Sequence, residues 1–83
     1  MAITQDDIVK WYENGKLKGA THMIIVCDTF DYGEFPVYVM PQEDAREKAQ
    51  VEREKPMQKV MEVYSLSLPV LDQFHEPRAF HYD

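Results

Sequence analysis

The chain has 83 residues, fifteen acidic against nine basic side chains, a net charge of −6 and one cysteine. This length predicts one domain over residues 1–83, and a single cysteine excludes an internal disulfide and a cysteine-based zinc site. No apolar run approaches the ~20 residues of a membrane span, and the first residues lack a signal-peptide pattern. We therefore expect a cytoplasmic protein that makes no membrane contact.

The first predicted element is a helix over residues 5–14. Its apolar residues fall at positions i, i+3 and i+4 and form one face: Ile8, Trp11 and Tyr12. Asn14-Gly15 is a typical helix end, because glycine adopts the left-handed conformation that follows a helix without strain. We expect Leu17, in the connector that follows, to tuck under the helix.

Two strands and a loop come next. The segment Met23–Cys27 is apolar at every position, so the strand over residues 21–28 should be covered on both faces and lie in the middle of a sheet. Residues 29–35 are predicted to form a long hairpin loop, and residues 36–40 a second strand. Pro36 lacks an N–H group, which suits an edge strand or the first residue of a strand.

Three further segments complete the chain: a helix over residues 42–55, a third strand over residues 57–65 and an irregular tail over residues 66–83. The apolar face of this helix is thin and consists mainly of Ala45 and Ala49, so the helix should cover the sheet lightly. Asp44 and Lys48 stand four residues apart, in the favoured order for an ion pair. The aromatic end of the tail is expected to dock on the rest of the domain.

These elements predict an α+β fold with a small three-stranded antiparallel sheet, strand order 2-1-3 and a ββαβ core. Strict alternation in the third strand places Val60 and Tyr64 on one face and Val63 on the other. We expect both helices on the same face of the sheet, so the second face needs cover from the C-terminal tail or from a second subunit. The sequence therefore favours a homo-oligomer, either a dimer or a higher assembly.

Acidic and aromatic side chains alternate around the predicted loop: Asp28, Phe30, Asp31, Tyr32 and Glu34. Carboxylates at this spacing could hold a hard cation, but aromatic residues occupy the positions where an EF-hand has ligands. A loop-forming role of these acids is favoured over partner contact, and partner contact over a metal or catalytic role. The rings, if exposed, suit a protein interface or could stack a nucleobase. We expect Phe35 in the core and Tyr32 in solvent.

Basic side chains gather further along the chain. A phosphate could be bound by the basic group Arg46, Lys48, Arg53, Lys55 and Lys59. For a nucleotide ligand, Arg46, Lys48 or Arg78 would hold the phosphate, and rings such as Tyr32, Phe80 and Tyr82 would stack the base. The glutamates interleaved with the helical bases more often mark a solvated face with ion pairs. The acidic balance argues against direct nucleic-acid binding, because affinity there comes from neutralised phosphates.

Reactive residues do not assemble into a catalytic motif. Cys27 and His22 are five residues apart on one strand and so point to opposite faces, which rejects a nucleophile–base pair. His75 and His81 lack a third metal ligand at a recognised spacing. We assign no catalytic residue, no metal ligand and no cofactor, and enzymatic activity is not favoured.

The string KGATHMIIVCDTFDY at residues 18–32, followed by PVYV at residues 36–39, resembles a group of small uncharacterised proteins encoded by tailed bacteriophages and prophages. The resemblance covers about residues 5–66. It implies a small phage accessory protein that acts in the host cytoplasm, a class whose members commonly bind and block a host component. The string holds no active-site motif, so no functional residue is transferred through it.

The leading hypothesis is therefore a non-enzymatic binding protein that neutralises a host component, such as an anti-defence inhibitor that contacts a basic protein surface. The first alternative is an oligomeric sink for a nucleotide immune signal. A small metal-dependent hydrolase, in which Asp28, Asp31 or His22 converge on a water molecule, is a second alternative. A virion accessory role is the third.

Overall fold

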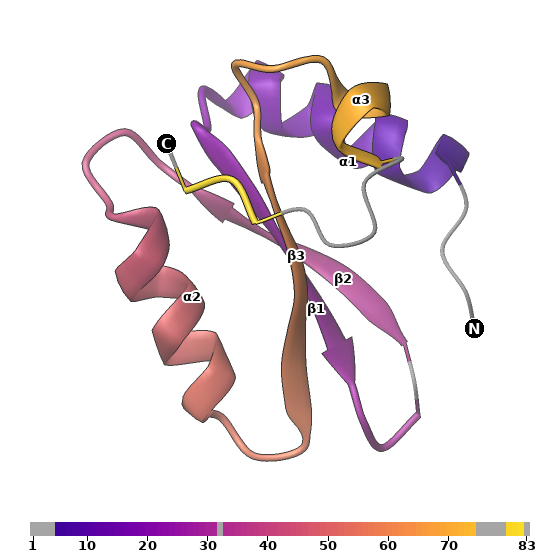
Figure 1. Ribbon diagram of the computed structural model, residues 1–83, viewed down its shortest axis with the longest axis vertical. Coiled ribbons are helices and arrows are strands. Elements are labelled where there is room, and N and C mark those ends of the chain that lie inside the picture. The colour runs from indigo at the N-terminus through magenta and orange to yellow at the C-terminus, as the bar shows by residue number, and fades with distance from the viewer. Residues whose placement is uncertain (1–4, 32, 75–79, 83) are drawn as a thin grey trace.

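A three-stranded antiparallel sheet forms the centre of the computed structural model (Figure 1). The structure describes residues 5–31, 33–74 and 80–82. Its elements in chain order are α1 (Gln5–Lys18), β1 (His22–Asp28), β2 (Glu34–Val39), α2 (Ala45–Glu54), β3 (Gln58–Ser65) and α3 (Val70–Phe74). None of the helices in these ranges is both long enough and apolar enough to cross a membrane.

The strands lie in the order β2-β1-β3, and β1 is antiparallel to both neighbours. The predicted α+β fold and strand order are confirmed. Met23, Ile24, Ile25 and Val26 in β1 have no exposed surface. Both faces of this strand are covered, which explains why the sequence is apolar at every position instead of alternating.

The two faces of the sheet carry separate apolar cores. Alternate residues of β1 point to opposite sides. Met23 and Ile25 pack with Ile8 of α1, whereas Ile24 and Val26 pack with the alanines of α2. We refer to these two sides as the α1 face and the α2 face.

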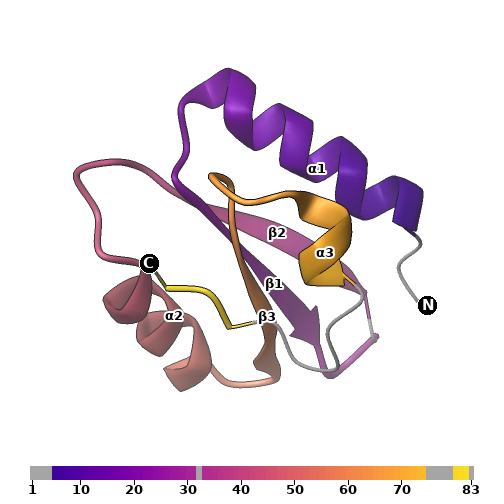
Figure 2. The same cartoon turned by 45° about the horizontal axis from the view of Figure 1, so that its top comes forward.

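The prediction that both helices share one face is wrong. Figure 2 shows α1 and α3 on one side of the sheet and α2 on the other. The large apolar side chains of α1 pack on one face, and the small alanines of α2 let that helix lie close to the other face. Each helix therefore covers a different face of the sheet. Cover for both faces comes from the chain itself. The expectation of a homo-oligomer thus loses its main argument and stays a prediction.

The first helix ends at a different glycine from the predicted one. Gly19 has a φ of 80° and donates to the Lys16 carbonyl at 3.1 Å, while the Ala20 N–H donates to the Gly15 carbonyl at 2.9 Å. This pair of bonds is the Schellman motif that closes a helix. The predicted end at Asn14-Gly15 is therefore wrong. Leu17 is 86% exposed, so the expectation that it tucks under the helix is wrong as well.

Gly15 serves packing inside the helix. A Cβ atom at this position would lie 2.8 Å from Leu66 Cδ1 and 2.8 Å from Tyr38 Cε1. The absent side chain lets β2 and the end of β3 approach α1 closely. The Tyr38 hydroxyl then donates to the Trp11 carbonyl at 2.8 Å and ties β2 to the helix.

Strand β2 begins earlier than predicted. The Asp28 N–H donates to the Gly33 carbonyl at 2.8 Å, so pairing starts at that point and Glu34 and Phe35 belong to the strand. Pro36 lies opposite Ile25 in this edge strand, which accommodates a residue without an N–H. Phe35 is 39% exposed, contrary to the prediction that it is core, because the edge strand is only partly covered.

Helix α2 is shorter than predicted because its cap lies inside the predicted span. The Asp44 carboxylate accepts hydrogen bonds from two N–H groups of the first turn. That cap makes the predicted Asp44–Lys48 ion pair wrong. The Lys48 ammonium group instead lies 2.8 Å from the Glu43 carboxylate.

A β-bulge interrupts the alternation of β3. Glu62 lies opposite Ile25 and Val60 lies opposite Val26, so Met61 is an extra residue on this strand. Val60 consequently packs against the core of the α2 face, and its predicted direction is wrong.

The segment after β3, predicted to be irregular, contains α3 and a buried polar clamp. The Gln73 side chain accepts from the Ser65 N–H at 2.7 Å and donates to the Ser65 carbonyl at 2.8 Å. Further along, Phe80 forms a parallel bridge with Val63. The described part of the tail therefore docks along β3, on the side where α2 lies (Figure 1).

Candidate binding surfaces

The loop between β1 and β2 is built by its aspartates. One Asp28 carboxylate oxygen accepts the Phe30 N–H at 2.8 Å, and one Asp31 oxygen accepts the Gly33 N–H at 2.8 Å. Each bond spans two residues and closes an Asx turn, as the loop-forming interpretation expects. The turns leave the Phe30 side chain 77% exposed. Tyr32, predicted in the same contact set, lies outside the described residues.

The turn between α2 and β3 lies against this loop. The Thr29 N–H donates to the Met57 carbonyl at 2.8 Å. Met57 has a φ of 61°, a left-handed conformation that costs a non-glycine residue free energy, yet its side chain is 58% exposed. The two connections thus bring large exposed apolar side chains to one end of the sheet. We call residues 28–31, 33 and 57 the loop end.

Glu34 stands apart from the loop acids. It lies in β2, opposite Cys27, and Lys59 of β3 lies opposite Cys27 on the other side. Its Oε2 atom is buried and has no hydrogen-bond partner within the described ranges.

A second surface forms where the tail meets α2. The Arg46 guanidinium lies 4.5 Å from the centroid of the Tyr82 ring, and Arg53 donates to the Tyr82 hydroxyl at 2.7 Å. Arg53 also lies 5.8 Å from the centroid of the Phe80 ring. The structure thus brings together Arg46 and Tyr82 from the predicted ligand set. Lys48 is held elsewhere by Glu43, and Arg78 is outside the described residues.

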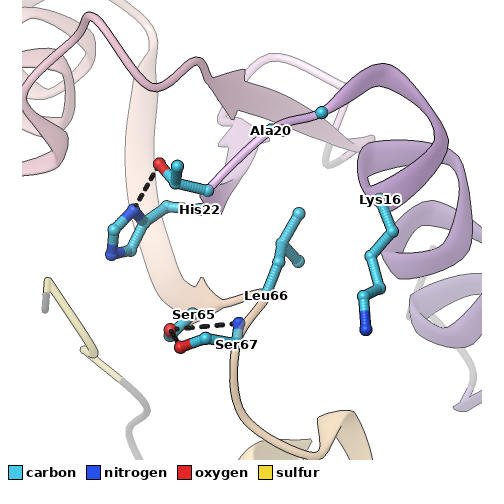
Figure 3. Close-up of a pocket in the computed structure, with 8 residues that line it drawn as sticks. Lys16, Ala20, His22, Ser65, Leu66 and Ser67 are labelled. Carbon is cyan, nitrogen blue, oxygen red and sulfur yellow. Dashed lines mark hydrogen bonds between the residues drawn. The ribbon is translucent and has the colours of Figure 1, made fainter.

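A pocket of about 490 Å³ opens between the end of α1 and the adjoining ends of β1 and β3 (Figure 3). Hydroxyl groups and an imidazole line it. The His22 Nδ1 atom lies 2.9 Å from the Thr21 hydroxyl, and the Ser65 and Ser67 hydroxyls lie 2.8 Å from each other (Figure 3). Both contacts join residues that are close in the sequence.

The geometry also separates the residues that a hydrolase would need to converge. His22 begins β1 and Asp28 ends it, so about six residue steps of roughly 3.3 Å lie between them. Within the described part of the chain, no three His, Cys, Asp or Glu side chains group closely enough to hold a metal ion. Cys27 is buried, and the alternation of side chains along β1 directs it to the side opposite His22.

One residue of these surfaces was missed by reasoning from the sequence. Arg53 was named there among the basic residues that could bind a phosphate, and its spacing of seven residues, about two helical turns, from Arg46 suits one side of α2. Met57 gave no signal, because a left-handed methionine depends on the tertiary hydrogen bond from Thr29.

Comparison with known protein families, with curated proteins and with solved structures finds no match to this chain. The phage resemblance thus enters the functional argument only as a proposal.

Proposed function

We propose that this chain is a non-enzymatic binding protein that docks a partner protein through the loop end. Phe30 is the anchor that enters a pocket on the partner, and Met57 widens the apolar contact. The observation that carries the proposal is the exposure of Phe30, which the Asp28 and Asp31 turns hold in solvent. Aromatic side chains and methionine are enriched at protein interfaces, and a few such anchors supply most of the binding energy.

The conformation of Met57 supports the same role. A glycine would adopt a φ of 61° without the cost that a side chain brings. A methionine at a strained and exposed position stabilises neither a core nor the turn. Backbone strain of this kind clusters at functional sites, and contact with a partner would explain why a methionine side chain occupies this position.

The loop carboxylates favour a basic partner. Asp28 and Asp31 each use one carboxylate oxygen in a turn, and residues 19–45 contain no lysine or arginine. Charges at the rim of an interface act mainly on the association rate and on the choice of partner. In the setting that the phage resemblance implies, the partner is a host protein with a basic surface, and binding blocks it.

The experiment compares four variants as baits against host lysate, with captured proteins identified by mass spectrometry. Phe30→Ser removes the anchor and Met57→Gly removes the second apolar contact while relieving the strained backbone. Asp28→Asn with Asp31→Asn keeps both turn acceptors and removes two charges. Leu17→Ser is the control, since it removes an apolar side chain of comparable exposure (86% against 77% for Phe30) from the last turn of α1, which precedes the start of β1.

We expect Phe30→Ser and Met57→Gly to lose the partner without loss of stability, and the double Asn variant to retain it with a slower, less salt-dependent association. Leu17→Ser should bind like the wild type. Capture of the same proteins by the wild type and by Phe30→Ser would contradict the proposal.

A further inference from the structure

The cluster where the tail meets α2 has a second property beyond docking. Its two guanidinium groups contact the same tyrosine, Arg46 over the ring and Arg53 at the hydroxyl. The rings of Phe80 and Tyr82 are nearly parallel, at an interplanar angle of 20° and a centroid distance of 6.5 Å. Two positive charges and two flat apolar surfaces therefore meet within the width of a few side chains.

The two guanidinium groups differ from the lysines of the same region in their contacts. In the described ranges, neither Arg46 nor Arg53 forms an ion pair, whereas Lys48 pairs with Glu43 and Lys55 with Glu52 on the same helix. The chain holds fifteen acidic and nine basic side chains, so acids are abundant. Two arginines that meet rings instead of carboxylates keep their donors available for an anion.

A shallow cavity continues the cluster. About 240 Å³ of space lies beside Phe80, lined also by Lys59, Val60 and Met61. It adds a third cation and apolar walls next to a ring that is 37% exposed. An aromatic group stacked on Phe80 could therefore rest against this cavity while its phosphate lies toward the arginines.

We propose that the cluster formed by Arg46, Arg53, Phe80 and Tyr82 binds a small phosphorylated ligand with a planar ring, of the mononucleotide class. Arg46 and Arg53 hold the phosphate by charge-assisted hydrogen bonds, and Phe80 stacks the ring. The site is separate from the loop end, and its test does not depend on the proposed protein partner.

The charge of the surroundings selects a small ligand over a nucleic acid. Glu47 and Glu54 lie on the same helix as the two arginines, and the chain as a whole carries −6. Polyanion binding requires a row of phosphate contacts, and this helix would repel the phosphates beyond the first. One or two phosphate groups match the two guanidinium groups.

The test measures binding to the full chain by isothermal titration calorimetry. The probes are AMP, ADP, adenosine, inorganic phosphate and a twelve-nucleotide single-stranded DNA. We expect saturable binding of AMP or ADP with a dissociation constant of about 1 mM or tighter. Adenosine and phosphate should each bind at least about tenfold more weakly than the nucleotide, because each makes only half of the contacts.

The variants separate a built site from general electrostatics. Arg46→Gln with Arg53→Gln should weaken nucleotide binding by about tenfold or more. Lys48→Gln with Lys55→Gln removes two positive charges from α2 and its C-cap, and should change the affinity for the nucleotide by less than about threefold. Phe80→Leu keeps an apolar side chain, removes the stacking surface and should weaken AMP but not phosphate. Circular dichroism confirms that each variant is folded.

Four results would overturn the inference. The first is no binding of AMP or ADP to the wild type at about 5 mM, a probe concentration on the order of several times the expected dissociation constant. The second is an equal loss of nucleotide affinity in the arginine and lysine double variants. The third is equal affinity of the wild type for phosphate and for nucleotide, and the fourth is tighter binding of the oligonucleotide than of AMP or ADP. The two proposals fail separately. If the wild type binds no nucleotide but captures its partner through Phe30, only the site proposed here fails. If it binds nucleotide but captures no partner, only the proposed protein-binding role fails.

Discussion

The two faces of the sheet are completed by different means. On the α1 face, large side chains interlock and hydrogen bonds fix the helix: the Tyr12 hydroxyl donates to the Leu68 carbonyl at 2.9 Å, and Tyr38 donates to Trp11. Burial raises the pKa of the Tyr38 hydroxyl. On the α2 face, alanines provide a thin cover and Tyr82 from the tail packs beside it. One face is closed by interlocked large side chains, and the other by a thin helix and the end of the tail.

This contrast explains where function can be placed. A deep, interlocked core tolerates little change, because displaced side chains leave cavities or clash. The α2 face is closed by arginines and rings near the surface, so a bound anion could be accommodated there without opening the core. The difference between the faces can be measured.

The largest effect is expected from truncating the central strand. Ile24 and Ile25 are neighbours with no exposed surface, and they point to the α2 face and the α1 face respectively. We expect Ile25→Ala to lower the free energy of unfolding by about 4 kcal/mol and Ile24→Ala by about 3 kcal/mol, because the lightly packed α2 face can relax into the cavity. Urea denaturation measures both. A larger loss for Ile24→Ala would mean that the α2 face is the more rigid one.

Gln73 tests the buried polar clamp on the α1 side. Its amide satisfies both the N–H and the carbonyl of Ser65, a residue with almost no exposed surface. Gln73→Met keeps a side chain of similar length but leaves the Ser65 N–H without this partner and the Ser65 carbonyl with only the 3.3 Å hydrogen bond from the Leu68 N–H. We therefore expect a loss of about 2 kcal/mol in urea denaturation. Asp72→Ala, an exposed neighbour, should change stability by about 0.5 kcal/mol or less. Equal stability of Gln73→Met and wild type would show that water can replace the clamp.

Gly15 tests the close approach of α1 to the sheet. Alanine favours a helix by about 1 kcal/mol over glycine, but its Cβ would meet Leu66 and the Tyr38 ring at 2.8 Å. Overpacking of this kind costs about 1–3 kcal/mol, so the net effect of Gly15→Ala should be a loss of about 1 kcal/mol. Asn14→Ala, on the exposed side of the same turn, should be neutral or slightly stabilising. Thermal melting compares the stability of both variants with that of the wild type. A Gly15→Ala variant more stable than the wild type would contradict the prediction.

The sequence predicted the features that follow from local pattern. An uninterrupted apolar segment placed β1 in the centre, and the spacing of Ile8, Trp11 and Tyr12 gave the inner face of α1. Prediction failed where a local signal competes with tertiary contact. The Asn14-Gly15 pair is typical of a helix end, but Gly15 instead allows close packing inside α1. The helix ends at a second glycine, Gly19, which has the positive φ.

The candidate surfaces were predictable only in part. The aspartates of the loop and the pair Arg46 and Tyr82 were singled out from the sequence, since residue type alone suggests turns and anion contacts. The exposure of Phe30 and the strained backbone of Met57 depend on how two connections meet in space. Assignment of the helices to opposite faces failed for a related reason, because burial on both sides of β1 does not say which helix covers which side.

The smallest effect concerns the ion pair between Glu43, which precedes α2, and Lys48 in the first turns of that helix. The hydrogen bond from the Lys48 ammonium group, followed by that from the Met40 N–H, lowers the pKa of the Glu43 carboxyl. A lowered pKa stabilises the fold at pH values above the ordinary value of 4.5, and that contribution is lost as the pH falls through the folded-state pKa. A double-mutant cycle with Glu43→Gln and Lys48→Gln should therefore give a small favourable coupling at pH 7 that disappears by about pH 3 and weakens in salt. A coupling that is the same at both pH values would show that the contact does not depend on the charge of Glu43, and would contradict the prediction.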